Sequence, residues 1–332
     1  QVLMTVLCTP LALAVGKRIG AIDKPNERKI HKQETVRLGG LAIFIAVNLG
    51  VVVLMAIMQE TFSHYACNLS GILGTGTMLF IVCVIDDCRN ISASVKLASQ
   101  IVCACIVFFT GNQLEINNVG LSADSGTVGM VLSLIMTVCW IVLLTNAINL
   151  IDGADGLAAG VVGIGCIALA YVAGSNHYYV TSLLLVIVAG ASLGILPFNF
   201  YPAKIFMGDC GSAYLGFMAA GISLLQPIKS ASLITYMMVL MAFVIPVSDI
   251  FFTSLKRVIQ KKPIMKADRN HLHHVLLKQG MGQRRLALYI YSIAALSGLD
   301  AIVYSKGLRV TALLLAVTLI IHCAIISFQR VE

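Results

Sequence analysis

Charged residues are scarce in this chain of 332 residues, because Asp, Glu, Lys and Arg together make up only 11% of it. Soluble domains average about 25% charged residues. Hydrophobic residues make up 58% of the chain, and a soluble fold of that composition would leave large apolar surfaces in water. The ten cysteines form no Cys-x-x-Cys pair, which argues against a disulfide framework and a structural zinc site. The composition therefore predicts a protein embedded in a lipid bilayer.

Long apolar runs divide the chain into candidate membrane helices, since a helix needs about 20 apolar residues to cross the hydrocarbon core. Eleven runs of about this length follow one another: 1–16, 38–58, 69–85, 95–110, 128–148, 157–174, 178–198, 211–225, 232–254, 286–304 and 310–328. We therefore expect an all-α, polytopic integral membrane protein with about 11 transmembrane helices, in a single helical domain over residues 1–332. The first run begins at Gln1 rather than at Met, so we expect that the natural N-terminus is missing. The basic pair Lys17 and Arg18 follows this run, whereas a signal peptide carries its charge before the apolar stretch.

Basic residues orient the predicted helices, because short cytoplasmic loops accumulate Lys and Arg. With loop 17–37 inside, the N-terminus lies outside, the C-terminus is cytoplasmic, and 20 of the 23 basic residues fall on the cytoplasmic side. The main cytoplasmic connections are then 17–37, 86–96, 149–156, 199–210 and 255–285. The net charge of +8 is thus gathered at the inner leaflet, which argues against nucleic acid as a partner.

Five acidic residues lie in these cytoplasmic connections, tightly flanked by apolar helices: Asp86, Asp87, Asp152, Asp155 and Asp209. Ionisable groups near lipid are costly, so their convergence on one face predicts a functional site. Asp86 and Asp87 are adjacent, and a divalent cation such as Mg²⁺ or a cationic substrate group would relieve their repulsion. The alternatives are a solvated helix end for the Asp pair and a helix N-cap for Asp155 or Asp209.

Two segments that contain glycine carry the other acids. The segment Asn149-Leu-Ile-Asp-Gly-Ala-Asp-Gly-Leu157 has two Asp-Gly steps three residues apart, which predicts a turn whose carboxylates point the same way. The segment 199–212 combines Asn199, Phe206 and Asp209 just before a helix, where an acid can hold a metal ion that in turn holds phosphate. Asp249 lies inside an apolar run and is a candidate to line a cavity.

A group of histidines lies in the loop 255–285, in the sequence Asp268-Arg-Asn-His-Leu-His-His274. The spacing of His271, His273 and His274 does not place all three side chains on one face of a helix, and no cysteine partners stand nearby. We therefore favour contact of these histidines and Arg269 with phosphate over a zinc site or an uninvolved polar loop.

Taken in order, these segments resemble one family. They are Asp23-Lys-Pro-Asn-Glu-Arg-Lys-Ile-His31, Arg37-Leu-Gly-Gly40, Asp86-Asp87, Asn149 to Leu157, Phe206-Met-Gly-Asp209 and His271-Leu-His-His274. Over nearly its whole length the chain is similar to the bacterial polyprenyl-phosphate N-acetylhexosamine-1-phosphate transferases, more to the WecA and TagO branch than to MraY. Each motif alone is weak, but their common order and common membrane face make the resemblance specific.

The resemblance implies a reaction at the cytosolic face of the bacterial cytoplasmic (inner) membrane. The phosphate of undecaprenyl phosphate attacks the β-phosphorus of a UDP-N-acetylhexosamine, commonly UDP-GlcNAc, giving a lipid-linked sugar and UMP. The implied cofactor is Mg²⁺, for which Mn²⁺ can substitute, with Asp209 and Asp87 as metal ligands. The implied catalytic residues are Asp86, Asp87, Asp209, His271, His273 and His274, and the implied substrate-binding residues are Lys96, Asn149, Asp152, Asp155, Asn199, Phe206 and Arg269. Phe206 is the expected stacking face for uracil.

Several alternatives remain open at the level of sequence. The donor can be another UDP-N-acetyl sugar, the product can feed wall teichoic acid, O-antigen or another envelope glycan, and the protein can be a monomer or a homodimer. Direct attack by the lipid phosphate is favoured over a covalent intermediate, because a phosphate monoester with a second pKa of about 6 is already largely dianionic at neutral pH. In another class, an ion-coupled secondary transporter also carries buried acids, although its sites lie near the bilayer midplane.

Overall fold

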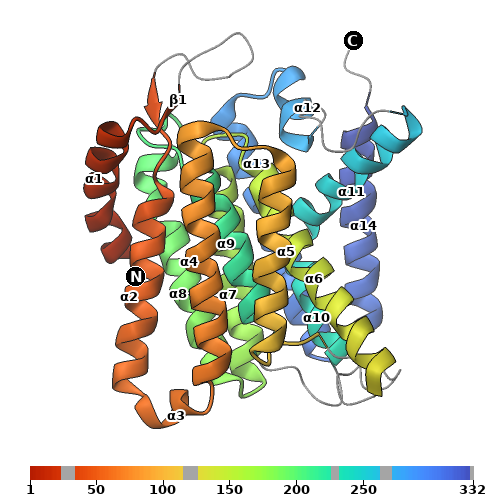
Figure 1. Cartoon of the computed structure of the whole chain (residues 1–332). Helices are drawn as coiled ribbons and strands as arrows, with labels where there is room; N and C mark the ends of the chain where they lie inside the picture. Colours follow the sequence, from red (N-terminus) through yellow and green to blue (C-terminus); the bar gives the residue numbers. More distant parts are fainter. Residues whose placement is uncertain (24–33, 115–125, 226–231, 262–270, 330–332) are drawn as a thin grey trace.

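The chain folds into a bundle of long helices whose connections gather at the two ends of the bundle (Figure 1). The computed structural model describes residues 1–23, 34–114, 126–225, 232–261 and 271–329. Its long helices are α1 (Val2–Ile19), α2 (Gly40–Ile57), α4 (Ala66–Arg89), α5 (Ala93–Phe109), α6 (Gly126–Ile151), α7 (Leu157–Ser175), α8 (Tyr179–Asn199), α9 (Gly208–Ile222), α10 (Ser232–Ala242), α11 (Val244–Ile259), α13 (Gln283–Ser305) and α14 (Arg309–Phe328). The short elements are β1 (Ile22–Asp23), β2 (Thr35–Val36), α3 (Gln59–Ser63) and α12 (Leu272–Lys278).

The prediction of an all-α, polytopic membrane protein is confirmed. In the described part of the chain, eight helices are long and apolar enough to cross a membrane, and the number is nine if the bent pair α10 and α11 counts as one span. The predicted number of about 11 is not confirmed, because α5 has 17 residues and α9 has 15, which is short for a crossing. Each of the eleven predicted apolar runs nevertheless contains a helix.

The predicted run 232–254 does not form one straight helix. The chain breaks between α10 and α11, which are bent by 82° to each other. Pro246 lies in the first turn of α11, where its ring and its missing N–H are incompatible with a helix that continues from the preceding residues. The break directs the basic last turn of α11, which contains Lys256 and Arg257, away from the axis of α10.

Helix α9 lies at the centre of the bundle, behind α4 in Figure 1, and packs against α2, α4 and α6. All of its residues are buried except Asp209. Its Gly- and Ala-rich sequence is apolar on every side, as expected for a helix surrounded by other helices. Helix α9 therefore places one partly exposed carboxylate, that of Asp209, at the upper end of the bundle in Figure 1.

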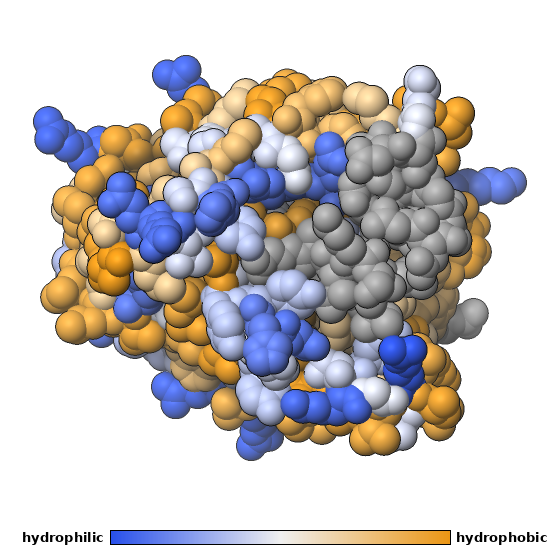
Figure 2. Space-filling view, turned by 90° about the horizontal axis from the view of Figure 1, so that it is seen from below, coloured by the Kyte–Doolittle hydropathy of each residue, from blue (hydrophilic) through white to orange (hydrophobic). Residues whose placement is uncertain are grey.

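The outer surface of the bundle is apolar along the helices and polar at the ends. On α14 the exposed side chains Val310, Leu314, Val317, Ile321 and Ile325 recur at helical spacing and form one outward stripe. The end view in Figure 2 shows hydrophobic residues around much of the margin and hydrophilic residues gathered on the end face. An apolar belt between two polar ends matches a bilayer that surrounds the helices.

A small pair of strands was not predicted from the sequence. In the antiparallel pair β1 and β2, Ile22 lies opposite Val36 and Asp23 lies opposite Thr35. Val36 also forms a parallel bridge to Ile205, close to the start of α9. These short strands lie at the same end of the bundle as α12, and this end contains the predicted cytoplasmic connections (Figure 1).

Candidate functional site

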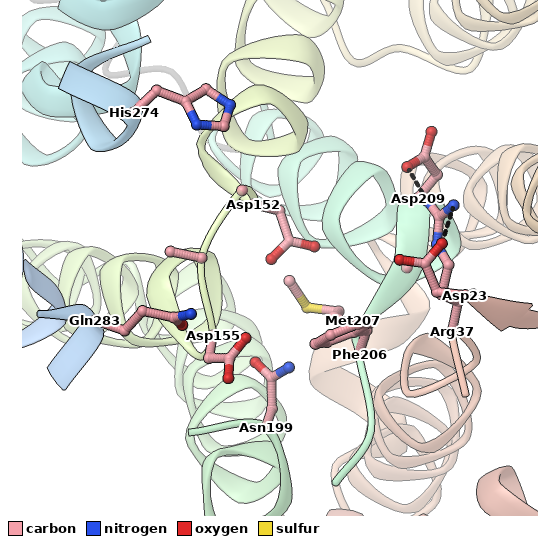
Figure 3. A pocket seen from close by; sticks show the side chains of 13 residues that line it. Asp23, Arg37, Asp152, Asp155, Asn199, Phe206, Met207, Asp209, His274 and Gln283 are labelled. Atoms are coloured by element: carbon pink, nitrogen blue, oxygen red, sulfur yellow. Dashed lines mark hydrogen bonds and ion pairs between the residues drawn. The ribbon is translucent and has the colours of Figure 1, made fainter. Parts of the chain in front are cut away.

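A cleft of about 250 Å³ lies at the end of the bundle where α9 begins (Figure 3). It is lined by Asp23, Arg37, Asp152, Gly153, Ala154, Asp155, Asn199, Phe206, Met207, Gly208, Asp209, His274 and Gln283. Figure 3 shows two groups of side chains, with Asp152 between them. We call Asp23, Arg37 and Asp209 the ionic side, and Asp155, Asn199, His274 and Gln283 the loop side. The lining includes six residues predicted as site residues: Asp152, Asp155, Asn199, Phe206, Asp209 and His274.

The remaining predicted residues are absent from the cleft lining or lie outside the described chain. Asp86, Asp87, Lys96, Asn149, His271 and His273 are not among the side chains that line the cleft. Arg269 lies outside the described residues. The cleft is therefore lined by only some of the predicted site residues.

Lys96 links two of the predicted carboxylates on the ionic side. Its Nζ donates to Oδ2 of Asp86 and to Oδ2 of Asp209, at 2.7 Å in each case. Ser92 sets the position of Lys96 along the chain, because its Oγ accepts from the N–H of Val95 and caps the start of α5 one turn earlier. Oxygens of two carboxylates from different helices thus converge on a single positive charge.

Arg37 links the acids on the opposite edge of the ionic side. Its Nη2 is 3.3 Å from Oδ1 of Asp87 and 3.3 Å from Oδ1 of Asp209, and its Nη1 is 3.7 Å from Oδ1 of Asp23. Burial lowers the pKa of the Arg37 guanidinium, but Asp87, Asp209 and Asp23 outweigh this effect and raise it. Arg37 is therefore a permanent cation among three carboxylates.

Backbone hydrogen bonds hold the Arg37 segment against the start of α9. The N–H of Phe206 donates to the carbonyl of Val36 at 2.8 Å, and the N–H of Gly39 donates to the carbonyl of Phe206 at 2.9 Å. We call these contacts between residues 36–40 and 205–209 the clasp. The clasp places Arg37 and Asp209 side by side, although 172 positions separate them in the sequence.

Asp86 and Asp87 have different surroundings, although they are adjacent. Oδ1 of Asp86 accepts from the N–H of Ile91 at 2.8 Å, and Oδ2 of Asp86 receives Lys96. Asp87 has a side chain with 0% exposure, and its two carboxylate oxygens accept from the N–H groups of Asp209 and Cys210, at 3.0 Å each. Asp86 therefore faces Lys96, while Asp87 faces Arg37 and the backbone of α9.

The turn between α6 and α7 supplies the middle of the cleft. Asn149, which was predicted to bind substrate, donates from Nδ2 to Oγ of Ser212 at 2.9 Å and so ties the end of α6 to α9. Oδ2 of Asp155 accepts from the N–H of Ala203 at 3.0 Å. Burial, followed by the nearby Asp209 carboxylate, raises the pKa of Asp152 to about 8. At neutral pH Asp152 is therefore largely protonated and can donate a hydrogen bond into the cleft.

The three predicted histidines occupy three different environments. Nδ1 of His271 is 2.9 Å from Oδ2 of Asp249, and Oδ1 of Asp249 accepts from the N–H of Leu272 at 2.7 Å, so Asp249 anchors the start of α12. Asp249 is not part of the lining of this cleft. His274 lines the cleft on the loop side. The histidines thus do not act as one group of equivalent ligands.

His273 packs against the turn that carries Asp152. A Cβ atom added at Gly153 would lie 2.0 Å from Nε2 of His273, so only glycine allows this contact. His273 is 2% exposed, and neither of its ring nitrogens has a hydrogen-bond partner among the described residues. Burial, followed by His274 and His271, keeps the pKa of His273 well below its usual range. His273 is therefore a neutral side chain that supports the Asp152 turn.

The predicted magnesium site remains a prediction. Among the described residues, no three His, Cys, Asp or Glu side chains are grouped as a ready metal site. Asp86 and Asp209 fit a hard divalent cation, since their oxygens already converge on the Lys96 ammonium. Asp87 fits less well, because both of its oxygens already accept backbone N–H groups.

Three residues with charged or polar side chains at the cleft received no role in the sequence analysis: Asp23, Arg37 and Gln283. Asp23 and Arg37 lie in segments that carry the family resemblance, and the position of Arg37 directly before Leu-Gly-Gly was the available signal. Gln283, at the start of α13, had no signal in the sequence. Its Oε1 is buried and has no hydrogen-bond partner within the described chain.

Comparison with known proteins gives a family match that covers the centre of this site. The sequence pattern of glycosyl transferase family 4 matches residues 69–226. This range contains the five predicted site carboxylates, from Asp86 to Asp209, whereas Arg37 and the histidines lie outside it.

Individual relatives match almost the whole chain. A probable undecaprenyl-phosphate N-acetylglucosaminyl 1-phosphate transferase of Bacillus subtilis is 37% identical over 328 residues, which cover 98% of this chain and 89% of the relative. A decaprenyl-phosphate N-acetylglucosaminephosphotransferase of Mycolicibacterium smegmatis is 30% identical, over 99% of this chain and 87% of the relative. A phospho-N-acetylmuramoyl-pentapeptide-transferase of Bacillus subtilis is 29% identical, over 83% of this chain and 87% of the relative.

Proposed function

The chain belongs to glycosyl transferase family 4, and we propose that it transfers N-acetylglucosamine-1-phosphate from UDP-N-acetylglucosamine to undecaprenyl phosphate, with release of UMP. The relative that is 37% identical over 98% of the chain is named for N-acetylglucosamine, whereas the relative named for an N-acetylmuramoyl-pentapeptide is 29% identical over 83% of the chain. This difference favours UDP-N-acetylglucosamine as the donor over other UDP-N-acetyl sugars.

One observation carries the proposal: a single cleft joins an ionic side to a loop side. The ionic side presents Arg37 and Asp209, with Lys96 behind them, where a diphosphate and a lipid phosphate would meet. The loop side presents amide and imidazole groups, with the partly buried ring of Phe206 beside them. A nucleotide diphosphate sugar needs both kinds of surface, because its phosphates are anionic while its base and sugar are neutral.

Mg²⁺ is the proposed cofactor, with Asp209 and Asp86 as the residues that would hold it. A divalent cation supplies charge neutralisation at the diphosphate during phosphoryl transfer. This pair is preferred to the earlier pairing of Asp209 with Asp87 because the Asp86 oxygen already faces a cationic group. Lys96 and Arg37 add fixed positive charge at the same place, so the cleft can bind an anionic substrate against its own carboxylates.

Direct attack by the lipid phosphate is the proposed chemistry. An oxygen of the lipid phosphate forms a bond to the β-phosphorus, the bond from this phosphorus to the oxygen that bridges it to the α-phosphate breaks, and UMP leaves with that oxygen. A phosphate monoester has a second pKa of about 6, so it needs no strong base at neutral pH. The environment of the Asp pair supports this route, because Asp87 has no exposed carboxylate surface and Asp86 is bonded to Lys96 and to Ile91.

The proposed setting is the cytoplasmic membrane of a bacterium, with the cleft facing the cytosol. The protein is a multi-pass membrane protein, and the cleft lies at the end of the bundle that contains the basic predicted loops. A polyprenyl acceptor reaches this end through the bilayer, while a nucleotide sugar arrives from the cytosol. The proposal holds for a monomer and equally for a homodimer.

Activity is tested with the purified full-length chain in lipid nanodiscs, supplied with undecaprenyl phosphate, Mg²⁺ and one labelled donor at a time. The donors are UDP-N-acetylglucosamine, UDP-N-acetylgalactosamine and UDP-N-acetylmuramoyl-pentapeptide. We expect UMP and a lipid-linked sugar in equal amounts, with the highest kcat/KM for UDP-N-acetylglucosamine. Uptake of a solute without UMP release would favour the transporter alternative and would contradict the proposal.

The orientation is tested with two cysteines on the same helix. Cys67 and Cys88 are both exposed, and they lie near opposite ends of α4. We expect a membrane-impermeant maleimide to label intact cells of a variant that keeps only Cys67, and to label the variant with only Cys88 after cell lysis. The reverse pattern would place the cleft on the outside.

A further inference from the structure

We propose that Asp87 is a positioning residue, which fixes the start of α9 and thereby holds Asp209 at the cleft, and that it meets neither the substrate nor the metal ion. The inference rests on the proposed function for the importance of Asp209. It assigns different tasks to the two adjacent acids, Asp86 and Asp87, which the sequence does not distinguish.

The start of α9 has no cap from its own segment. The first N–H groups of any helix lack partners within the helix, and a side chain at the N-cap position usually supplies one. In α9 this position is Met207, which makes no side-chain cap hydrogen bond. Asp87 takes the place of the missing cap from α4, since Oδ1 accepts the N–H of Asp209 and Oδ2 accepts the N–H of Cys210, at 3.0 Å each. Both oxygens of one carboxylate therefore serve the backbone of another helix.

The backbone conformation of Gly208 and its lack of a side chain leave room for the Asp87 carboxylate. Its φ angle is +73°, in the left-handed region that favours glycine. A Cβ atom added at Gly208 would lie 2.6 Å from Oδ2 of Asp87, which is too close for any side chain. The chain thus carries glycine at the one point where Asp87 must approach the backbone.

Groups of the protein itself offset part of the charge of Asp87. Arg37 Nη2 lies 3.3 Å from Oδ1 of Asp87, and the N-terminus of a helix also favours a negative charge. The side chain of Asp87 has 0% exposure, so substrate cannot reach it unless the capping bonds break. The Asp209 side chain, in contrast, is 22% exposed and lines the cleft.

Asp209 is the second residue of α9, so any displacement of the helix start also displaces the Asp209 carboxylate. Removal of the Asp87 oxygens would leave two N–H groups unpaired at a buried helix end, which is costly. The helix start would relax toward other partners, and the Asp209 carboxylate would leave its position between Lys96 and Arg37. Loss of Asp87 therefore removes activity through geometry.

The experiment compares four variants of the full-length protein in nanodiscs: Asp87→Asn, Asp87→Ala, Asp86→Asn and Asp86→Ala. Asparagine is an efficient helix cap but is neither a base nor a strong metal ligand, so the order of the two Asp87 variants separates the two roles. The measurements are hydrogen exchange of the amides of Asp209 and Cys210, turnover, the Mg²⁺ concentration for half-maximal rate, and the pH profile of the residual rate.

We expect Asp87→Ala to speed exchange at these two amides by about tenfold and Asp87→Asn to speed it less, with residual turnover higher for Asn than for Ala. The Mg²⁺ requirement and the pH profile of the Asp87→Asn residual rate should match those of the unmodified protein. The two Asp86 variants should leave exchange at Asp209 and Cys210 unchanged.

Unchanged exchange in Asp87→Ala, or a raised Mg²⁺ requirement in Asp87→Asn, would overturn the inference. Equal loss of turnover in Asp87→Asn and Asp87→Ala with no change in exchange would overturn it as well. Failure of the proposed function is distinguishable, because a protein that releases no UMP but shows the expected exchange pattern still supports Asp87 as the anchor of α9.

Discussion

The two sides of the cleft differ in how far the protein satisfies its own polar groups. On the ionic side and next to it, the carboxylates of Asp86, Asp87 and Asp209 all bond to Lys96, Arg37 or backbone N–H groups. On the loop side and just behind it, buried polar atoms in the described chain have no partner; these are Oδ1 of Asn199, Oε1 of Gln283 and both ring nitrogens of His273.

This difference indicates a division of work within one cleft. Fixed charges that are paired in advance can act on a developing transition state without reorganisation. A buried acceptor without a partner destabilises the protein. A neutral ligand group that donates a hydrogen bond to it removes this cost and therefore binds more tightly. We therefore expect changes on the ionic side to lower turnover, and changes on the loop side to alter substrate binding or stability.

The largest effect should come from Asp209→Asn. The Asp209 carboxylate is the only charged group that α9 contains, it lines the cleft, and it joins Lys96 to Arg37. We expect kcat to fall by about a thousandfold or more, as for removal of a preorganised electrostatic group. Steady-state UMP release, with the melting temperature as a check on folding, measures this. If kcat of a correctly folded Asp209→Asn variant fell by less than tenfold, Asp209 would not be essential for catalysis.

Gly153→Ala should have the next largest effect and probes the support behind the cleft. The new Cβ atom would collide with His273, so the Asp152 turn or the histidine must move. Displacement of a site by about 1 Å can lower turnover about a hundredfold. Gly74→Ala is the matched control, because no atom lies within 4 Å of a Cβ at Gly74. Similar activity in the two variants would show that the contact with His273 is not needed.

Gln283→Ala should have a smaller effect that appears in KM. The unpaired Oε1 is available to a donor group of the nucleotide sugar, and loss of one neutral hydrogen bond costs about three- to tenfold in affinity. Because the same bond would exist in the ground state and the transition state, kcat should stay unchanged. Gln279→Ala is the control, since Gln279 is exposed and bonds to Gln329. A fall in kcat with constant KM would contradict a role of Gln283 in substrate binding and would indicate a role in the chemical step.

The smallest effect concerns the stability of the protein without ligands. The folded-state pKa of Asp152 is raised to about 8. Between pH 4 and pH 8 the folded chain therefore holds a proton that the unfolded chain releases, and stability falls as pH rises through this window. We expect Asp152→Asn to melt a few degrees higher than the unmodified protein, by a margin that widens from pH 6 to pH 8.5. A margin that narrows over this range would contradict the raised pKa.

Much of the fold could be predicted because the signals are local. Each apolar run contains a helix, since hydrophobic length and backbone pairing in lipid depend on a single segment. The 82° break at Phe243 was missed, because a proline near a helix start can either begin a new helix or be absorbed by one. The pair β1 and β2 was missed because its two-residue strands depend on contact with Ile205, far along the chain.

The site could be predicted as a set of residues but not as an arrangement. Successive side chains on a helix point about 100° apart, so adjacency alone does not tell which of Asp86 and Asp87 faces α9. The same holds for His271, His273 and His274, whose partners come from α11 and from the Asp152 turn. Arg37 stood in a recognised segment, but its role depends on the clasp.

The clasp can form only late in the synthesis of the protein. Val36 and Ile205 are joined by a parallel bridge, yet six of the long helices separate them along the chain. During synthesis the segment around Arg37 emerges early and has no partner until the residues after α8 have been inserted. A ribosome that stalls before residue 205 leaves a chain in which Asp23 and Arg37 have no α9 to meet. A nascent chain that ends there lacks both Asp209 and the clasp, so we expect no transferase activity before α9 has been inserted.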